Sequence, residues 1–446
     1  MNAEASELSD GARLLSSRGF DAQSERGWTK VVELISDVYD EKTNPNGYIS
    51  LGIAENRLMH KELTRYINGS FKLPERMLTY ADGGFGSREL RATLAQFLTE
   101  HLKSREPIPQ ENVICFPGVT LGIESIATMI ANPGEGILLG RPYYNSFVHD
   151  IGLRAGVKTV EVSFGSVDQF TEESVVKYEE ALLQAQRDGI KVRGVILCSP
   201  HNPLGRCYPR NVLIEFLKLC QRYQIHLISD EIYAFSVWEN KDYPEAVSFT
   251  SILQVNSSDI VDPNLLHVLW GISKDFGANG LRIGCVITVN EPMRVAMIAH
   301  SLFTYPSGAT DKMVVDLLSD STFVRSYIKE NQARMAHAYA HTVSFLKQKK
   351  LPYYEGSNAA FFIWIELRTA YLKNHGRSTE VSPTEGAEID RELHNKLLEN
   401  RVFIGKGSAY GDEFGGRFRI VFTHSDDHLN KGLEKIWQVV GGNRCT

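Results

Sequence analysis

The sequence predicts an α/β protein with a large domain on a mostly parallel sheet and a smaller α+β domain. Its 446 residues are too many for one compact core and suit two domains in contact. Val192–Cys198 is β-branched and almost continuously apolar, as a strand buried on both faces should be, and a helix follows from Pro209 to about Tyr223. Strand, helix and strand in this order imply right-handed crossovers, and therefore parallel strands covered by helices.

The N-terminal part of the chain, residues 1–50, is expected to form an arm that contributes to the smaller domain. It contains one helical pattern and a polar turn at residues 42–47. Residues 51–320 are assigned to the large domain, in which the Pro133-Gly134 pair ends a helix. The helical patterns up to this point cover residues 30–39, 87–102 and 120–130.

The remaining elements follow the same periodic patterns. Three more strands are predicted in the large domain, at residues 225–229, 265–270 and 285–289. After about Ser319 the pattern changes, and residues 321–446 are assigned, with the arm, to the smaller domain. Its expected elements are a long helix at 322–348, an apolar segment at 359–367, a polar loop at 372–388, a helix at 389–400 and a strand at 418–422.

Composition argues against several classes of protein. A net charge of −6 is the opposite of the basic excess that nucleic-acid-binding proteins show. No apolar run reaches the roughly 18–20 residues that cross a bilayer. The six cysteines form no C-x-x-C pair and the first residues are polar, which is typical of a reduced, cytoplasmic protein. His337 and His341 stand at i, i+4 without a third ligand, so no metal site is predicted.

Polar and charged residues gather next to the predicted strands, where open α/β sheets bind their ligands. Singly, each group has an ordinary interpretation, since Asn202-Pro203 suits a turn and Asp230-Glu231 a helix cap. Their order, spacing and shared position at strand ends favour one joint site. The four groups are Ser199-Pro200-His201-Asn202-Pro203-Leu204-Gly205, Asp230-Glu231-Ile232-Tyr233, Ser273-Lys274-Asp275-Phe276-Gly277 and Gly280-Leu281-Arg282-Ile283-Gly284.

In that order the four groups resemble N-P-x-G, D-E-x-Y, S-x-x-K and R-x-G, the signature of the fold-type-I, class I/II aminotransferases. The resemblance implies the fold type I of PLP-dependent transferases, with a seven-stranded sheet, and pyridoxal 5′-phosphate (PLP) as cofactor. PLP is an electron sink that needs a lysine amine to hold it and an acidic group at its pyridine nitrogen. The resemblance also implies a homodimer with shared active sites and a small amino-acid substrate.

The resemblance assigns a role to each matching residue. Lys274 would hold the cofactor as a Schiff base and transfer the substrate proton, Asp230 would face the pyridine nitrogen, and Tyr233 would hydrogen-bond the ring 3-oxygen. These three are the expected catalytic residues. The other expected cofactor contacts are Asn202 at the same oxygen, Tyr144 stacked on the ring, and Val119, Thr120, Ser273 and Arg282 at the phosphate. Val119 and Thr120 begin a predicted helix, whose free N–H groups favour an anion.

Two further matches lie outside these groups, at Tyr80 and Arg419. Tyr80, in LTYADGGFG, matches a tyrosine that reaches the phosphate bound by the neighbouring subunit. Arg419, in GRFRIVF, matches the arginine that pairs with the α-carboxylate of the substrate. Both assignments rest on the resemblance alone.

Within the family, the chain resembles most the 1-aminocyclopropane-1-carboxylate (ACC) synthase-like proteins of filamentous fungi. Gly52-Ile53-Ala54-Glu55-Asn56 is similar to the G-L-A-E-N of that group, and Glu55 matches a glutamate close to the substrate. Two departures stand out. Residues 83–88 (GGFGSR) replace D-Y-H-G-L-P, so a tyrosine is missing there and Tyr80 is the candidate to replace it. Gly271 replaces the first serine of S-x-S-K and removes one hydroxyl from the phosphate site.

The motifs predict loss of the proton on the α-carbon and leave the following step open. The resemblance implies an external aldimine and a quinonoid, from which transamination, β-elimination or γ-elimination can follow. The alternatives are therefore an aminotransferase or ACC synthase-like enzyme of secondary metabolism, a carbon–sulfur β-lyase acting on cysteine S-conjugates, and a true ACC synthase using S-adenosylmethionine. A non-catalytic protein that keeps the fold is a fourth interpretation.

Overall fold

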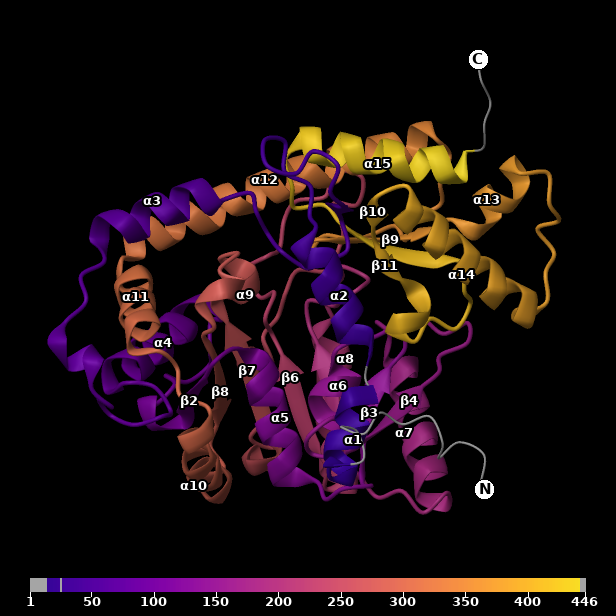
Figure 1. The fold of residues 1–446 in the computed structure, drawn as a ribbon. Coiled ribbons are helices and arrows are strands. Elements are labelled where there is room, and N and C mark those ends of the chain that lie inside the picture. The colour runs from indigo at the N-terminus through magenta and orange to yellow at the C-terminus, as the bar shows by residue number, and fades with distance from the viewer. Residues whose placement is uncertain (1–13, 25, 442–446) are drawn as a thin grey trace.

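A seven-stranded sheet forms the centre of the molecule (Figure 1). The computed structural model describes residues 14–24 and 26–441. The strand order is β2-β8-β7-β6-β5-β3-β4; β8 runs antiparallel to both neighbours and the other pairings are parallel. The predicted α/β class and mostly parallel sheet are thus confirmed. The strands are Val113–Phe116 (β2), Gly136–Gly140 (β3), Lys158–Val162 (β4), Val192–Cys198 (β5), His226–Asp230 (β6), Leu266–Gly271 (β7) and Gly284–Thr288 (β8).

Helices cover both faces of this sheet, because its strands are apolar on both sides. On β2, Cys115 packs into the core formed with α4, whereas Ile114 packs into the core formed with α5. The first face carries α4 (Arg88–His101), α7 (Glu172–Arg187) and α8 (Arg210–Tyr223), and the second carries α5 (Val119–Ile130), α6 (Phe147–Gly152) and α10 (Glu291–His300). No described helix combines the length and the apolar character needed to cross a membrane.

The C-terminal part of the chain builds a second, antiparallel sheet in the order β11-β12-β9. Two helices of this part, α12 and α15, pack side by side at the top of Figure 1. The N-terminal segment joins it, because β1 (Ile49–Ser50) pairs in parallel with β10 (Val402–Phe403). The domain boundaries at residues 50 and 320 stay predictions. The other elements here are β9 (Phe362–Glu366), β11 (Gly405–Lys406), β12 (Arg417–Val421), α12 (Ser321–Gln348), α13 (Arg368–Asn374), α14 (Pro383–Glu399) and α15 (Asp426–Val440). The helix α11 (Gly308–Ser319) precedes α12 and contacts α3 (His60–Ser70).

Two predicted segments differ from the structure. The helix expected at residues 30–39 is α2 (Arg26–Ser36), preceded by α1 (Ser17–Ser24). It ends early because the chain enters a parallel β-bridge of Val38 with Tyr48, in which the N–H of Tyr39 donates to the carbonyl of Tyr48 at 2.8 Å. The polar loop expected at 372–388 was wrong at both ends, since α13 enters it and α14 begins inside it. Ser382 and Glu385 form a capping box that starts α14, a helix signal inside a polar stretch.

Candidate active site

The predicted motifs meet at one edge of the central sheet. The parallel strands β5, β6 and β7 end at Cys198, Asp230 and Gly271. The motifs that contain Asn202, Asp230 and Lys274 stand at these three ends, in that order. The group that contains Arg282 does not follow a strand, as the sequence suggested, but precedes β8. It still reaches the same edge, because β8 runs in the opposite direction.

Lys274 lies in α9 (Ile272–Asp275), the short helix after β7. Its Nζ donates a hydrogen bond to the carbonyl oxygen of Ala54 at 2.7 Å. Burial, followed by the charge of Arg419, lowers the pKa of Lys274 to about 8. About a tenth of such an amine is neutral at pH 7, far more than for an exposed lysine. A neutral amine is what a nucleophile or a proton acceptor requires.

Asp230 is the last residue of β6 and is buried, with 3% of its surface exposed. Its Oδ1 accepts the backbone N–H of Ile232 at 3.2 Å. Burial raises the pKa of Asp230 to about 7, against the lowering effects of that N–H and of Lys274. A buried carboxylate is costly without a cationic partner, and the protonated ring nitrogen of a cofactor is such a partner.

Arg419 and Asn202 form a buried pair beside these two residues. Nη1 of Arg419 donates to Oδ1 of Asn202 at 2.9 Å, and Nη2 donates to the carbonyl of Gly52 at 2.6 Å. The amide nitrogen of Asn202 lies 3.5 Å from the hydroxyl of Tyr233. The guanidinium carbon of Arg419 lies over two rings, at 4.4 Å from the centre of Phe362 and 4.8 Å from that of Tyr410. The arginine is therefore fixed in place before any ligand binds.

Arg282 lies against the start of α5, where Gly118 is the N-cap residue. The guanidinium donates to the carbonyl oxygens of Pro117 and Asn279, both at 3.0 Å. Gly118 has φ +95°, and a Cβ on it would stand 2.1 Å from Nη2 of Arg282, so only glycine lets the guanidinium come this close. The positive group and the free N–H groups of the helix start together suit a phosphate.

Four more predicted residues lie near this cluster. Val119 and Thr120 open α5, and Ser273 precedes Lys274 in α9. Tyr144 is half-buried ahead of α6, and its ring meets Phe147 edge-on at 5.2 Å. Burial raises the pKa of Tyr144 to about 12, so its ring is neutral at ordinary pH. A neutral aromatic ring in this place can stack on a planar cofactor.

The last two predicted residues are Tyr80 and Glu55. Tyr80 is 83% exposed, and its ring contacts Tyr305 at 5.9 Å rather than the cluster. Its expected role concerns a neighbouring subunit and stays a prediction. Glu55 pairs with Arg57 at 2.7 Å, and it is close enough to Lys274 for its charge to raise the pKa of that amine. Its expected place near the substrate stays a prediction.

The sequence reasoning missed three contributors to the site. The carbonyl groups of Gly52 and Ala54 accept hydrogen bonds from Arg419 and Lys274, although the motif around them was noted only for Glu55. Asp150 of α6 is buried, and Oδ2 of its carboxyl has no hydrogen-bond partner among the described residues. Burial, and then the charge of Asp230, raises the pKa of Asp150 to about 8. No local motif marks Asp150.

The cluster fits PLP on its own chemistry. Asp230 offers a buried anion for the pyridine nitrogen, and Lys274 offers an amine of lowered pKa for the aldehyde. Arg282 donates to two carbonyl oxygens among the described residues, so it offers a positive charge for the phosphate beside Gly118. Each polar end of the cofactor therefore has a complementary group.

Comparison with known proteins agrees with this arrangement. The ACC synthase-like protein 1 of Bos taurus is 33% identical over 451 residues, which cover 98% of this chain and 85% of that protein. The "Probable inactive 1-aminocyclopropane-1-carboxylate synthase-like protein 2" of Mus musculus is 33% identical over 420 residues, covering 92% and 68%. The ACC synthase 8 of Arabidopsis thaliana is 30% identical, covering 95% and 89%. The expected closeness to fungal proteins stays a prediction.

Solved structures and a family model complete the comparison. Aspartate aminotransferase from Thermus thermophilus with maleate matches with a TM-score of 0.70 at 19% identity, covering 95% of this chain and 99% of that one, and shows the fold. The model of the family "Aminotransferase class I and II" matches residues 52–436. This chain therefore belongs to the aminotransferase class I and II family, whose members depend on PLP.

Proposed function

We propose that this protein is an enzyme that uses PLP to remove the α-proton of an α-amino acid or an amino-acid conjugate. The observation that carries the proposal is one buried cluster that joins Lys274, Asp230 and the Asn202–Arg419 pair. It contains an amine whose pKa is lowered to about 8, a carboxyl group for the ring nitrogen of the cofactor and a fixed guanidinium for the carboxylate of the substrate.

Arg419 would bind and orient the substrate. Its guanidinium already holds two oxygen acceptors and lies over two aromatic rings, so little freedom is lost when a carboxylate arrives. A planar fork matches the two oxygens of a carboxylate better than a lysine does. This position would present the α-carbon to Lys274.

Lys274 and Asp230 would then move and hold protons. When bound, PLP supplies the electron sink that makes the α-proton acidic. The amine of Lys274 would take that proton, since its pKa is about 8. Asp230 would hold a proton at the ring nitrogen, and the pKa of its carboxyl would fall from about 7 once that cation is beside it.

The reaction that follows is best supported as an aminotransferase or ACC synthase-like one, with a carbon–sulfur β-lyase as the alternative. The experiment is incubation of the PLP-loaded protein with amino-acid/2-oxo-acid pairs, cysteine S-conjugates and S-adenosylmethionine, followed by mass spectrometry. A new 2-oxo acid indicates transamination, whereas pyruvate, ammonia and a free thiol indicate the lyase. Methylthioadenosine would indicate ACC synthesis, which the changed segment at residues 83–88 disfavours.

The alternative of a non-catalytic protein is favoured by the names of two relatives, the "Probable inactive 1-aminocyclopropane-1-carboxylate synthase-like protein 2" of Mus musculus and of Homo sapiens. Retention of Lys274, Asp230 and Arg419 in one cluster supports catalysis instead. Lys274→Ala should keep the fold and lose turnover, because it removes the attachment point and the base together. Turnover in that variant equal to that of the unmodified protein would refute the proposed chemistry. So would a failure of the unmodified protein to exchange the α-proton of the substrate with solvent.

We also propose that the protein is a homodimer. Exposed apolar side chains gather beside Tyr80, whose ring contacts Tyr305. Tyr80 and Phe303 are 83% and 79% exposed, which is unusual for large apolar side chains on a free surface. A second copy is the partner that the family suggests. We define this exposed apolar patch as Leu78, Tyr80, Leu302, Phe303 and Tyr305.

A further inference from the structure

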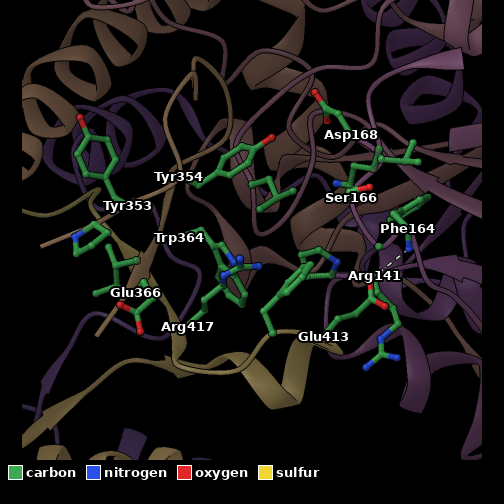
Figure 2. A pocket seen from close by; sticks show the side chains of 18 residues that line it. Arg141, Phe164, Ser166, Asp168, Tyr353, Tyr354, Trp364, Glu366, Glu413 and Arg417 are labelled. Atoms are coloured by element: carbon green, nitrogen blue, oxygen red, sulfur yellow. Dashed lines mark hydrogen bonds between the residues drawn. The ribbon is translucent and has the colours of Figure 1, made fainter. Parts of the chain in front are cut away.

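The loop that follows β4 forms one wall of a cavity of about 600 Å³, opposite residues of the C-terminal part of the chain. Figure 2 shows Phe164 and Asp168 of this loop on one side of the space and Tyr354 on the other. Gln169 also lines the cavity, but its amide contacts the turn that carries Asn202, which is not part of the wall. The loop therefore joins the cavity wall to the proposed active site.

The Asn202 turn, which we define as residues 201–206, is closed by two backbone hydrogen bonds. The N–H of His201 donates to the carbonyl of Arg206, and the N–H of Gly205 donates to the carbonyl of His201, both at 2.8 Å. Both bonds involve His201, the residue directly before Asn202. Groups that fix His201 therefore also fix the peptide from which the side chain of Asn202 projects.

Three consecutive residues of the loop after β4 hold this turn. Asp168 pairs with Arg206 at 3.1 Å, and the ring of Phe170 lies 4.3 Å from the guanidinium carbon of the same arginine. Between them, Nε2 of Gln169 lies 3.2 Å from Nε2 of His201. Both of these last side chains are buried, at 5% and 3% exposed, so water does not compete for the contact.

The protonation of His201 fixes the direction of this hydrogen bond. Burial, and then the charge of Arg206, lowers the pKa of His201 to about 3, so the ring is neutral. Its Nδ1 accepts the N–H of Leu204 at 3.4 Å, which places the proton of the neutral ring on Nε2.

An N–H on Nε2 of His201 requires an acceptor. The amide nitrogen of Gln169 faces it, while Oε1 of the same amide has no hydrogen-bond partner within residues 14–24 and 26–441. Half a turn of the amide keeps its shape and exchanges the two atoms. The buried oxygen and the ring N–H then become partners of each other, as buried polar groups require.

We propose that Gln169 and His201 are positioning residues that hold the side chain of Asn202 at the cofactor. Oε1 of Gln169 accepts the proton of Nε2 of His201, and His201 fixes the Asn202 turn. Asn202 is thereby kept in its contact with Arg419 at 2.9 Å. The inference rests on the proposed function and on the expected hydrogen bond between Asn202 and the 3-oxygen of the PLP ring.

The first experiment measures which nitrogen of His201 carries the proton, in the PLP-loaded protein labelled with ¹⁵N-histidine. The signal is assigned by its loss in His201→Gln. NMR should show the proton on Nε2 from about pH 6 to pH 8, without titration. A proton on Nδ1, or a ring that becomes charged in this range, would overturn the proposal without reference to any variant of Gln169.

The same spectrum should change in Gln169→Met, which keeps the length of the side chain and removes its hydrogen bonds. Gln254→Met is the matched control, because Gln254 is also partly buried and its Nε2 donates to the carbonyl of Leu102 at 2.8 Å. The control should leave the signal of His201 unchanged. An equal change in both variants would show a general loss of packing and would contradict the proposed contact.

The second experiment follows the absorbance of bound PLP against pH. Asn202→Ala should move the midpoint upward by about half to one pH unit, the equivalent of one hydrogen bond. The reason is that an N–H donor draws negative charge from the 3-oxygen, so its loss makes the nitrogen that joins PLP to Lys274 more basic. Gln169→Met should move the midpoint in the same direction by a smaller amount, and Gln254→Met should not move it.

The double variant Gln169→Met, Asn202→Ala decides whether Gln169 acts through Asn202. Its midpoint should equal that of Asn202→Ala alone, since two residues that act in series do not add. Additive shifts would overturn the proposal, as would a shift in Asn202→Ala with none in Gln169→Met, and both results would leave the proposed function intact. No shift in Asn202→Ala would instead refute the expected contact with the 3-oxygen, and the inference that rests on it.

Discussion

At the scale of the residue, the chemistry of Lys274 is set by its burial. Burial and the charge of Arg419 lower the pKa of its amine to about 8. The neutral fraction of an amine falls about tenfold for each pH unit below its pKa. We therefore expect the rate at which the apo-protein attaches PLP to Lys274 to rise about tenfold per pH unit and to level off above pH 8.

Rapid-mixing absorbance, with borohydride trapping and mass spectrometry of the modified lysine, measures this profile. Arg419→Gln is the matched variant, because it removes a charge that lowers the pKa and should move the midpoint to higher pH. A rate that keeps rising to pH 10 in the unmodified protein would mean that Lys274 behaves as an exposed lysine.

Arg419 gives a prediction about substrate affinity. Hydrogen bonds to charged groups contribute about 1.5–3 kcal/mol, which corresponds to roughly ten- to a hundredfold in binding. Arg419→Ala should raise KM by that order and change kcat less, because the carboxylate is not the reacting group. Arg419→Lys should recover only part of the loss, since an ammonium cannot form the two parallel bonds. Steady-state kinetics measure both constants, and the PLP spectrum checks that the variants are folded. An unchanged KM would mean that the carboxylate of the substrate binds to another residue.

At the scale of elements, the junction of β2 and α5 forms the proposed phosphate site. Gly118→Ala should weaken PLP binding by tenfold or more, because the new Cβ would occupy the position of the Arg282 guanidinium. The left-handed backbone adds a cost of about 1–3 kcal/mol in stability. Gly134→Ala is the control, since Gly134 also has a positive φ, +88°, but an added Cβ would meet no atom within 4 Å.

Dialysis equilibrium with PLP and thermal unfolding of both apo-variants separate the two effects. The control should lose stability and keep its PLP affinity. If both variants retained PLP equally, Arg282 would not be the phosphate ligand. If both lost it equally, backbone strain would explain the loss without any role for Arg282.

At the scale of the whole molecule, the exposed apolar patch predicts association. Phe303→Asp should shift the protein from dimer to monomer in light scattering, because burial of a carboxylate opposite its own copy is unfavourable. Val176→Asp, an exposed apolar position on α7 outside the patch, should leave the mass unchanged. A monomeric wild-type protein at working concentrations would refute the dimer.

The same proposal predicts complementation across subunits. Tyr80→Ala and Lys274→Ala should each be weakly active or inactive alone. Mixed dimers of the two variants should regain up to half of the activity of the unmodified dimer, because one of their two sites then holds both intact residues. No recovery in mixed dimers that are verified by mass would mean that Tyr80 does not serve the partner's site.

The sequence by itself determined the elements and the chemistry that lie close together along the chain. The strand at Val192–Cys198 was predicted with its observed ends, because a continuous β-branched run has few alternatives. Lys274 and Asp230 were found because their motifs stand at the carboxyl ends of predicted strands and match the family signature. The first three strands of the large sheet were not singled out, because β2 and β3 are short apolar runs without a distinct period and β4 is a short strand of mixed polarity.

Only the tertiary structure decided how distant residues meet. Arg419 reaches Asn202 across 217 positions, and Lys274 reaches the carbonyl of Ala54 across 220. Asp150 lies close to Asp230, and Trp364 and Gln169 line one cavity, without any motif that links them. Local periodicity reports which face of an element is apolar, whereas these contacts depend on how all the elements pack around two sheets, which no single segment encodes.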